Sequence, residues 1–368
     1  MDYIFWIPVV LTCLFLASGF VFLFRIPVSR VSKISEYPKI SIIIPARNEE
    51  HNIGKLLKSI FEQEFSADEV IVVNDESTDR TKEISLEFGA RVIDSESLPD
   101  GWLGKPWACY QGAKAAEGEI LIILDSDIEL ERGGLKKIAD TFISKNENEK
   151  VVMSIAPYHK VKEFYEDFSA MFNIIMVGAM NAFTPFKSEP TGLFGPSLII
   201  SKEDYFSIGG HEAVKEKVLE NVFMAELLQK KGCRLLCLGG RGSLSFRMYP
   251  DGFGKLINGW TKAFASGASR VSPFAMTMII FWISAGFLSA IFFARSLVIG
   301  EDIILWCAFY LAYALQLIWM LKRLGKFKFI SGLLFPLHLI FYVVVFSRSA
   351  YFQKTGRKVE WKARKVRG

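Results

Sequence analysis

Long apolar runs stand at both ends of the chain, and a more polar stretch separates them. Residues 3–24 carry no charge between Asp2 and Arg25, and this run is long enough to cross a bilayer. Three further apolar runs occupy the C-terminal part, at about 273–294, 303–321 and 329–346. The stretch 38–265 has the charge density of a soluble domain. We therefore expect a membrane-bound catalytic or binding domain rather than a channel.

This pattern divides the chain into parts. They are a membrane anchor over 1–30, a catalytic domain over 38–265, membrane segments over 270–348 and a basic tail over 349–368. The first apolar run lacks a small-x-small cleavage site and has its basic residues behind it, so an uncleaved anchor fits better than a signal peptide. Arg25, Arg30 and Lys33 follow this run and favour a cytoplasmic position for the catalytic domain.

The last apolar run decides the number of crossings. Four crossings from an outside N-terminus would leave the basic tail outside, against the tendency of basic residues to stay inside, whereas three crossings would keep it inside. The run 329–346 is short, contains Pro336 and His338, and has basic residues on both flanks. We expect it to be re-entrant or interfacial. The basic residues of the tail are Arg348, Lys354, Arg357, Lys358, Lys362, Arg364, Lys365 and Arg367.

Short apolar runs that fit buried strands alternate with helical patterns in the soluble stretch. The strand candidates are Ile40–Ile44, Glu69–Val73, Ala90–Ile93, 119–124 and a run near 151–156. The helix candidates are a pattern with Ile53, Leu56, Leu57 and Ile60 on one face, a helix capped by Ser77 or Thr78 and ending near Phe88, and a helix from about Pro106 to Ala116. Polar loops follow the strands, so the alternation predicts an α/β fold with a mostly parallel sheet and a nucleotide-type cleft.

Carboxylates stand where the strand candidates end. The strand 119–124 runs into Asp125 and Asp127, and the carboxyl ends of parallel strands form the ligand-binding edge of an open sheet. Two hard oxygen donors suit Mg²⁺ or Mn²⁺ held against a diphosphate. A plain turn is the alternative, because Asp and Ser favour turns. Asp75 follows an earlier strand, where it can accept hydrogen bonds from a base or ribose or close a local turn.

Several classes of protein are disfavoured. No G-x-G-x-x-G or G-x-x-x-x-G-K-[ST] follows any strand candidate, which argues against a dinucleotide-binding domain and a P-loop ATPase. Cys233 and Cys237 lie four apart, but no second Cys/His pair completes a zinc site. The net charge is only +5 and the basic excess borders the apolar runs, so anionic lipid explains it better than nucleic acid.

An ordered set of motifs resembles the family 2 glycosyltransferases of the GT-A fold. The motifs are Ile42-Ile43-Ile44-Pro45-Ala46-Arg47-Asn48-Glu49-Glu50, Val72-Val73-Asn74-Asp75-Glu76-Ser77-Thr78-Asp79 and Leu124-Asp125-Ser126-Asp127. Further segments resemble a bacterial membrane branch of that family, which attaches a sugar to C30 carotenoid acids. They include Gly101–Gly112, Pro157-Tyr158-His159, Phe164–Ala170, Phe246-Arg247-Met248-Tyr249, Gly259-Trp260-Thr261-Lys262 and Val359-Glu360-Trp361-Lys362.

The resemblance implies an inverting, multi-pass membrane glycosyltransferase with a cytoplasmic catalytic domain, using UDP-glucose and Mg²⁺ or Mn²⁺. By resemblance, Pro45, Arg47 and Glu49 line the nucleotide pocket and Asp75 contacts the uracil or ribose. Asp127 is the expected metal ligand, with Asp125 nearer the sugar or ribose. Lys105, in a Gly-flanked loop, can reach a phosphate as a mobile charge, or it is an ordinary surface lysine.

The resemblance also implies an acidic pair that opens a helix after a Gly-Gly segment and supplies the catalytic base. Here Glu220 is followed by Asn221, so Glu220 alone remains to serve. A carboxylic acid acceptor is already ionised near pH 7, so Glu220 can instead position the acceptor or sugar. A solvated helix glutamate is the plain alternative.

Near the end of the soluble stretch, the family's Gln/Arg-x-x-Arg-Trp segment is absent, which argues for a single transfer rather than polymer synthesis. Arg247 and Lys262 can bind diphosphate or an acceptor carboxylate, and Trp260 is a candidate acceptor contact. The apolar stretch 164–183 is either a buried helix or a surface that admits a lipid tail.

The sequence leaves rival functions open. The nearest rival is the same sugar transfer to another lipid acceptor, such as a polyprenyl phosphate, a hopanoid or a glycerolipid. A sugar-phosphate nucleotidyltransferase would want a Gly-rich basic first loop, which Pro45–Glu50 does not supply. A non-catalytic membrane protein would not need Asp75, Asp125, Asp127 and Glu220.

Overall fold

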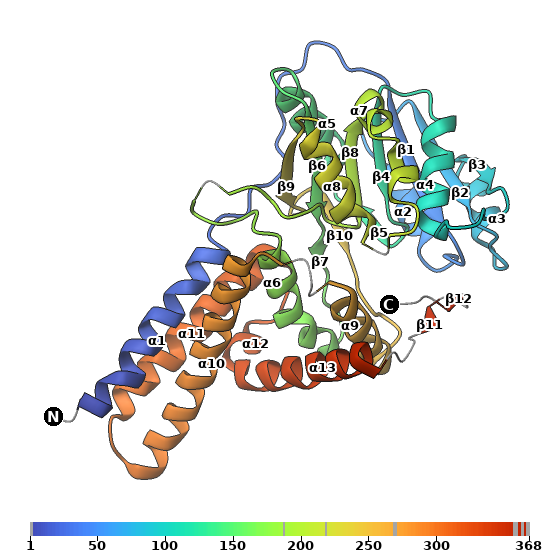
Figure 1. Cartoon of the computed structure of the whole chain (residues 1–368). Coiled ribbons are helices and arrows are strands. Elements are labelled where there is room, and N and C mark those ends of the chain that lie inside the picture. Colours follow the sequence, from blue (N-terminus) through green and yellow to red (C-terminus); the bar gives the residue numbers. More distant parts are fainter. Residues whose placement is uncertain are drawn as a thin grey trace. The chain divides into compact units, whose positions relative to one another are not determined.

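The chain forms two units, one built around a β-sheet and one made mostly of helices (Figure 1). The computed structural model describes residues 3–186, 188–217, 219–267, 271–355, 360–361 and 364–365. The sheet unit comprises Pro27–Tyr158 and Gly192–Arg247, and the helical unit comprises Met1–Ile26, His159–Thr191 and Met248–Gly368. Residues 159–191 and 248–265, which the sequence placed in a domain over 38–265, are thus grouped with the apolar helices.

A seven-stranded sheet organises the sheet unit, in the order β3-β2-β1-β4-β8-β6-β9. Its strands are β1 (Ile40–Ala46), β2 (Glu69–Asn74), β3 (Arg91–Asp94), β4 (Ile120–Leu124), β6 (Val151–Ala156), β8 (Ser197–Ser201) and β9 (Arg234–Gly239). β1 pairs in parallel with β2 and β4, whereas β8 runs antiparallel to β4 and β6. The sheet is therefore mostly parallel, as predicted.

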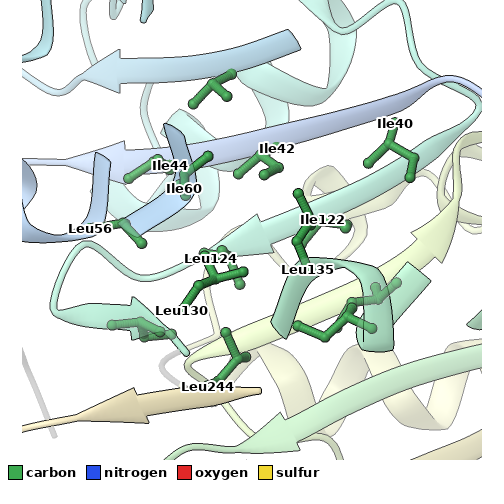
Figure 2. Close-up of a cluster of buried hydrophobic side chains, with 14 of the residues drawn as sticks. Ile40, Ile42, Ile44, Leu56, Ile60, Ile122, Leu124, Leu130, Leu135 and Leu244 are labelled. Carbon is green, nitrogen blue, oxygen red and sulfur yellow. The ribbon is translucent and has the colours of Figure 1, made fainter. Parts of the chain in front are cut away.

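Both faces of this sheet are covered, because alternate residues of each strand point to opposite sides. Ile42 and Ile44 pack in one buried cluster with side chains of α2 and α5 (Figure 2), and Ile43 packs in another with side chains of α4 and α8. The helices of the unit are α2 (Ile53–Phe61), α3 (Thr81–Glu87), α4 (Gly104–Ala115), α5 (Gly134–Asn146), α7 (Lys202–Ser207), the 3₁₀ helix η2 (Gly210–Val214) and α8 (Glu220–Lys230). At Gly112 a Cβ would lie 2.5 Å from Cγ2 of Ile43, so glycine sets the close approach of α4 to β1.

Five shorter strands lie outside the seven-stranded sheet in the described residues. β5 (Ile128–Leu130) pairs antiparallel with β10 (Leu244–Phe246), and β7 (Tyr158–His159) lies where the chain passes from the sheet unit to the helical unit. β11 (Glu360–Trp361) pairs antiparallel with β12 (Arg364–Lys365). The rest of the predicted basic tail, at 356–359, 362–363 and 366–368, lies outside the described residues.

The predicted cap of the second helix was wrong. α3 begins at Thr81, and Asp79 Oδ1 accepts hydrogen bonds from both the backbone N–H and the hydroxyl of Thr81. Ser77 and Thr78 bond instead to Asn48 of the neighbouring loop. A contact between distant segments thus outweighs the local capping preference.

Apolar helices make up the helical unit. They are α1 (Tyr3–Phe22), the 3₁₀ helix η1 (Phe164–Ser169), α6 (Ala170–Ala179), α9 (Phe253–Gly267), α10 (Pro273–Ile299), α11 (Ile303–Leu324), α12 (Phe329–Leu333) and α13 (Phe335–Thr355). Among the described residues, α10, α11 and α13 are long and apolar enough to cross a membrane, and Trp6–Phe22 of α1 forms a shorter apolar helix. Within the stretch 164–183, residues 164–179 fold as η1 and α6, and most of α6 is buried, as the buried-helix alternative predicted.

The last apolar run is longer than the sequence suggested. It breaks at Leu334 and then continues as α13 to Thr355, well past residue 346. Pro336 does not shorten α13, because it lies in the first helical turn, where proline is tolerated.

Candidate active site

The predicted site residues of the sheet unit converge because parallel strands end at one edge. Pro45 and Ala46 of β1 pair with Val73 and Asn74 of β2, and β4 runs alongside β1 through the pair Ile43–Ile123. Arg47, Asp75 and Asp125 follow directly from these three neighbouring strand ends. The sheet therefore brings together side chains that are far apart in the sequence.

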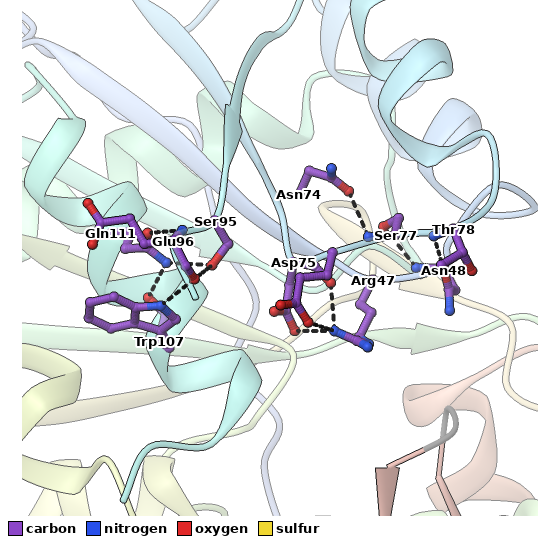
Figure 3. Close-up of polar contacts among 11 residues, drawn as sticks. Arg47, Asn48, Asn74, Asp75, Ser77, Thr78, Ser95, Glu96, Trp107 and Gln111 are labelled. Atoms are coloured by element: carbon purple, nitrogen blue, oxygen red, sulfur yellow. Dashed lines mark hydrogen bonds and ion pairs between the residues drawn. The ribbon is translucent and has the colours of Figure 1, made fainter. Parts of the chain in front are cut away.

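Arg47 joins the first two of these loops (Figure 3). Its Nη1 donates to the backbone oxygen of Asp75 at 2.9 Å and lies 3.6 Å from Asp75 Oδ2 and 3.1 Å from Glu76 Oε2. Asp75 is buried, with 6% of its surface exposed, and its own backbone N–H donates to Ala46. The guanidinium thus holds a buried carboxylate at the sheet edge.

Backbone geometry fixes the same two loops against each other. Asn48 and Glu76 have φ of 53° and 51°, a left-handed conformation that Asn tolerates better than most residues. The Asn48 side chain accepts from the Thr78 backbone, and the Ser77 hydroxyl accepts from the Asn48 backbone. Glu49 is anchored similarly, because its backbone donates to Thr81 Oγ1 and its carboxylate accepts from Asn52.

Lys105 lies in the first turn of α4, not in the loop that the sequence predicted, and it bridges two acids. Its Nζ is 2.7 Å from Asp125 Oδ1 and 3.4 Å from Glu220 Oε1, and it donates to the backbone oxygen of Gly195. Burial opposes the charge, but the carboxylates of Asp125 and Glu220 outweigh it and raise the pKa of Lys105. This lysine is therefore a fixed cation in an acidic cluster rather than a solvated surface residue.

Glu220 opens α8 and is nearly enclosed, with 11% of its side chain exposed. Burial raises its pKa, although the nearby charge of Lys105 opposes that shift. Asn221 Nδ2 donates to Glu220 Oε1 at 3.3 Å, so the same oxygen faces both Lys105 and Asn221. The solvated-glutamate alternative is therefore wrong for this residue.

Asp125 and Asp127 have different surroundings. Asp125 is half-buried, and its backbone N–H donates to the Pro196 oxygen, because β8 pairs antiparallel with β4 through Ser197 and Leu124. Asp127 is exposed two residues further on. Among the described residues, no group of three or more His, Cys, Asp and Glu side chains is placed to hold a metal. A divalent ion shared with a diphosphate needs only one or two carboxylates, so Asp125 and Asp127 fit that form of site.

Sequence reasoning missed the Gly195 carbonyl and the Tyr205 hydroxyl near this cluster. The Gly195 carbonyl gave no signal, since its role depends on the antiparallel β8. Tyr205 and His211 form a buried pair, with the Tyr205 hydroxyl 2.8 Å from His211 Nδ1. Burial, with a smaller contribution from the charge of Lys105, lowers the pKa of His211 to about 3. His211 is therefore neutral and structural at ordinary pH.

Three predicted residues lie away from this cluster in the chain. Arg247 is the last residue of the sheet unit, just after β10. Lys262 and Trp260 belong to α9 of the helical unit. Trp260 is completely buried, stacks on Phe172 at 4.8 Å between ring centroids, and donates to Ser169. Its predicted contact with the acceptor is therefore not supported, because apolar packing already encloses the indole.

Comparison with known proteins assigns the class. A family model described as Glycosyl transferase family 2 matches residues 41–209. A mannosyltransferase from Pyrobaculum calidifontis, solved in complex with GDP-Man and Mn²⁺, has a TM-score of 0.53 and 18% identity over 92% of this chain and 97% of its own. Together with the curated relatives described next, these matches establish that the chain belongs to glycosyltransferase family 2 and has the GT-A fold.

The curated relatives are more specific. The 4,4'-diaponeurosporenoate glycosyltransferase of Staphylococcus aureus (strain USA300) is 36% identical over 333 residues, 88% of this chain and 87% of that protein. The protein of the same name from strain bovine RF122 / ET3-1 is 35% identical over 340 residues, 89% of this chain and 88% of that protein. The chain is thus a glycosyltransferase similar over nearly its whole length to enzymes named for a carotenoid acid.

Proposed function

We propose that this protein transfers glucose from UDP-glucose, with inversion, to the carboxylate of a C30 carotenoid acid dissolved in the membrane. The observation that carries the proposal is the cluster of Lys105, Asp125 and Glu220 at the sheet edge that also holds Asp75. The name of the curated relatives supports the acceptor. The apolar helices of the helical unit suit an acceptor that arrives from the bilayer.

The nucleoside diphosphate is assigned to the edge formed by β1, β2 and β4. Pro45, Arg47 and Glu49 line the nucleotide pocket, and Asp75 accepts hydrogen bonds from uracil or ribose hydroxyls. Lys105 supplies a cation for the diphosphate, and Arg247 and Lys262 are further cations for the diphosphate or the acceptor carboxylate.

Asp127, with help from Asp125, would hold Mg²⁺ or Mn²⁺ against the diphosphate, and Asp125 also faces the sugar or ribose. When bound, the ion offsets the charge that develops on the leaving diphosphate. The carotenoid carboxylate is already ionised, so it needs no strong base to become a nucleophile. Glu220 holds Lys105 and orients the acceptor or the sugar, and it accepts a proton where an acceptor carries one.

Chain connection and charge support a proposed membrane arrangement. We assign α1, α10 and α11 as crossing helices of a bacterial cell membrane. The chain enters the sheet unit at Pro27, two residues after Arg25, and the last turn of α11 contains Lys322 and Arg323. Basic residues at these ends favour the cytoplasm for the sheet unit.

Replacing Arg47 with glutamine is expected to weaken donor binding. The change removes the guanidinium that holds Asp75, so the apparent KM for the donor should rise about threefold to tenfold while kcat changes less. Steady-state kinetics with varied UDP-glucose measure both values. Arg80→Gln is the matched control, since Arg80 pairs with exposed Glu87. An unchanged KM for Arg47→Gln would remove Arg47 from the nucleotide pocket.

A direct transfer assay tests the proposed function. Membranes that contain the protein are incubated with radiolabelled UDP-glucose and Mg²⁺ or Mn²⁺, with and without a C30 carotenoid acid. We expect label in a coloured, base-labile ester only when the acid is added. Label in a colourless lipid would instead assign a polyprenyl phosphate, hopanoid or glycerolipid acceptor, and the absence of any metal-dependent transfer or hydrolysis would argue against the enzyme activity.

A further inference from the structure

The segment α12–α13 has an apolar outer face and contacts with several other helices of its unit. α13 buries Phe335, His338, Leu339, Tyr342, Val345 and Ser349 along one face. The opposite face exposes large apolar side chains, including Leu337 (54%), Ile340 (54%) and Val344 (60%). By length and composition this helix is long enough to cross a bilayer. Its contacts lead to a different arrangement.

The three helices α1, α10 and α11 define two ends of a bundle. Gln316 Nε2 donates to Leu16 and Arg323 donates to Phe24, so α1 and α11 run in the same direction. α10 runs the opposite way, because Trp282 donates to Gln316 whereas Phe293, further along α10, packs against Tyr310, earlier in α11. The C-terminal ends of α1 and α11 and the start of α10 therefore lie at one end of the bundle, which we call the near end.

The break between α12 and α13 lies far from the near end. The Tyr310 hydroxyl donates to the backbone oxygen of Leu333. The ring of Phe335 packs against the rings of Tyr310 and Tyr313, with 4.6 Å between ring centroids in each pair. Tyr313 precedes the end of α11 by a rise of roughly 16 Å, and half of a typical hydrocarbon layer is about 15 Å. Leu339 meets α10 at Gly286, near the middle of that helix. The break thus reaches about mid-membrane.

The other end of α13 returns to the near end. Ser349 Oγ donates to the Thr261 backbone, and Arg348 donates to Asn258 Oδ1, so α13 ends against α9. α9 follows Met248, where the chain leaves the sheet unit, and it ends at Gly267 shortly before α10 begins at Pro273. The C-terminal end of α9 therefore belongs to the near end. In Figure 1, α13 begins beside α10 and α11 and runs away from them at a steep angle towards α9, not alongside them.

We propose that α12–α13 is a re-entrant element that enters and leaves the bilayer on the near side. Its outer face of Leu337, Ile340 and Val344 contacts acyl chains of that leaflet. Lys326 and Lys328 precede α12, and Arg348 and Lys354 lie near the end of α13, so cations stand at both places where the segment meets the headgroups. The tail then emerges on the side of the sheet unit. This inference rests on the proposed crossing by α1, α10 and α11.

Single-cysteine labelling tests the topology in the full chain. The five native cysteines are first replaced by serine, and one cysteine is then introduced at a time. Glu301→Cys reports the membrane side of the α10–α11 turn, and Lys354→Cys reports the side of the end of α13. The exposed Glu147→Cys reports the side of the sheet unit. With a membrane-impermeant maleimide on intact spheroplasts, we expect label at position 301 alone, and label at all three after permeabilisation. Label at position 354 in intact spheroplasts would overturn the re-entrant element. Missing label at position 301 would instead refute the crossing of α10 and α11.

Depth measurement distinguishes lipid contact from protein contact. A fluorophore on Leu337→Cys, Val344→Cys or Tyr351→Cys is quenched in proteoliposomes by lipids with a nitroxide deep in the acyl chain or at the headgroup. We expect the deep quencher to act at least about twofold more strongly at position 337 than at 351, with the reverse order for the headgroup quencher. Deepest quenching at position 344 would indicate a crossing helix. No lipid quenching at 337 and 344 would indicate that protein covers this face.

Discussion

Changing Asp127 to asparagine is expected to lower sugar transfer about 100-fold or more, with the folded protein retained. The substitution keeps size and polarity but removes the charge that would hold the divalent ion against the diphosphate. Loss of part of that electrostatic stabilisation, about 2.7 kcal/mol, corresponds to a rate factor of about 100. Asp127 is exposed, so the folded state does not depend on buried packing of its side chain. Initial rates of glucoside formation at saturating donor measure the effect.

Two comparisons make this result specific. Glu147→Gln removes an exposed carboxylate at the end of α5 and should leave the rate unchanged. Titration with Mn²⁺ should show that any residual activity of Asp127→Asn needs a higher ion concentration than the unsubstituted enzyme. Normal activity at the same ion concentration would exclude Asp127 as the metal ligand.

The Glu220→Gln variant is expected to lose about tenfold or more in turnover while donor binding is preserved. Glutamine keeps the shape but cannot form the ion pair with Lys105, so it leaves that cation held mainly by Asp125 and the Gly195 carbonyl. It also removes a group that can accept a proton or orient the acceptor. Turnover with the carotenoid acid and donor affinity by calorimetry separate the two effects.

A second variant tests whether turnover depends on the position of the Glu220 carboxylate or on its charge. Asn221→Ala removes the amide that donates to Glu220 but leaves the carboxylate in place. This variant should therefore lose less turnover than Glu220→Gln. Near-normal turnover of Glu220→Gln with the carotenoid acid would reject a catalytic or orienting role for this side chain.

The apolar runs predicted the strands of the sheet unit well, because burial of apolar side chains determines where these strands lie. Ile40–Ile44, Glu69–Val73 and the run 119–124 are strands within one or two residues of the predicted bounds, and the carboxylates behind them meet at one sheet edge. The resemblance to the family 2 glycosyltransferases was confirmed by the family model and by the curated relatives.

Contacts between distant segments explain what the sequence did not predict. Ser77 and Thr78 are residue types that favour helix N-caps, but both instead form hydrogen bonds with Asn48 of the neighbouring loop. The sequence predicted Lys105 in a loop. In the structure α4 begins at Gly104, so Lys105 is helical, and the antiparallel β8 brings the Gly195 carbonyl within hydrogen-bond distance of it. Trp260 was a candidate acceptor contact, yet its indole is buried in an apolar cluster and its N–H donates to Ser169.

The ion pairs of Lys105 have a consequence for the order of events at the site. An anionic acceptor that approached Asp125, Asp127 and Glu220 without a compensating charge would be repelled, and Lys105 is already shared between Asp125 and Glu220. Under the proposed function, a nucleotide sugar bound with a divalent ion would offset the charge of the aspartates, and a phosphate would replace a carboxylate beside Lys105. A carboxylate acceptor would then meet less repulsion in the donor complex than in the free enzyme. A lysine shared between two acids would thereby favour an order of binding in which the nucleotide sugar precedes the lipid acid.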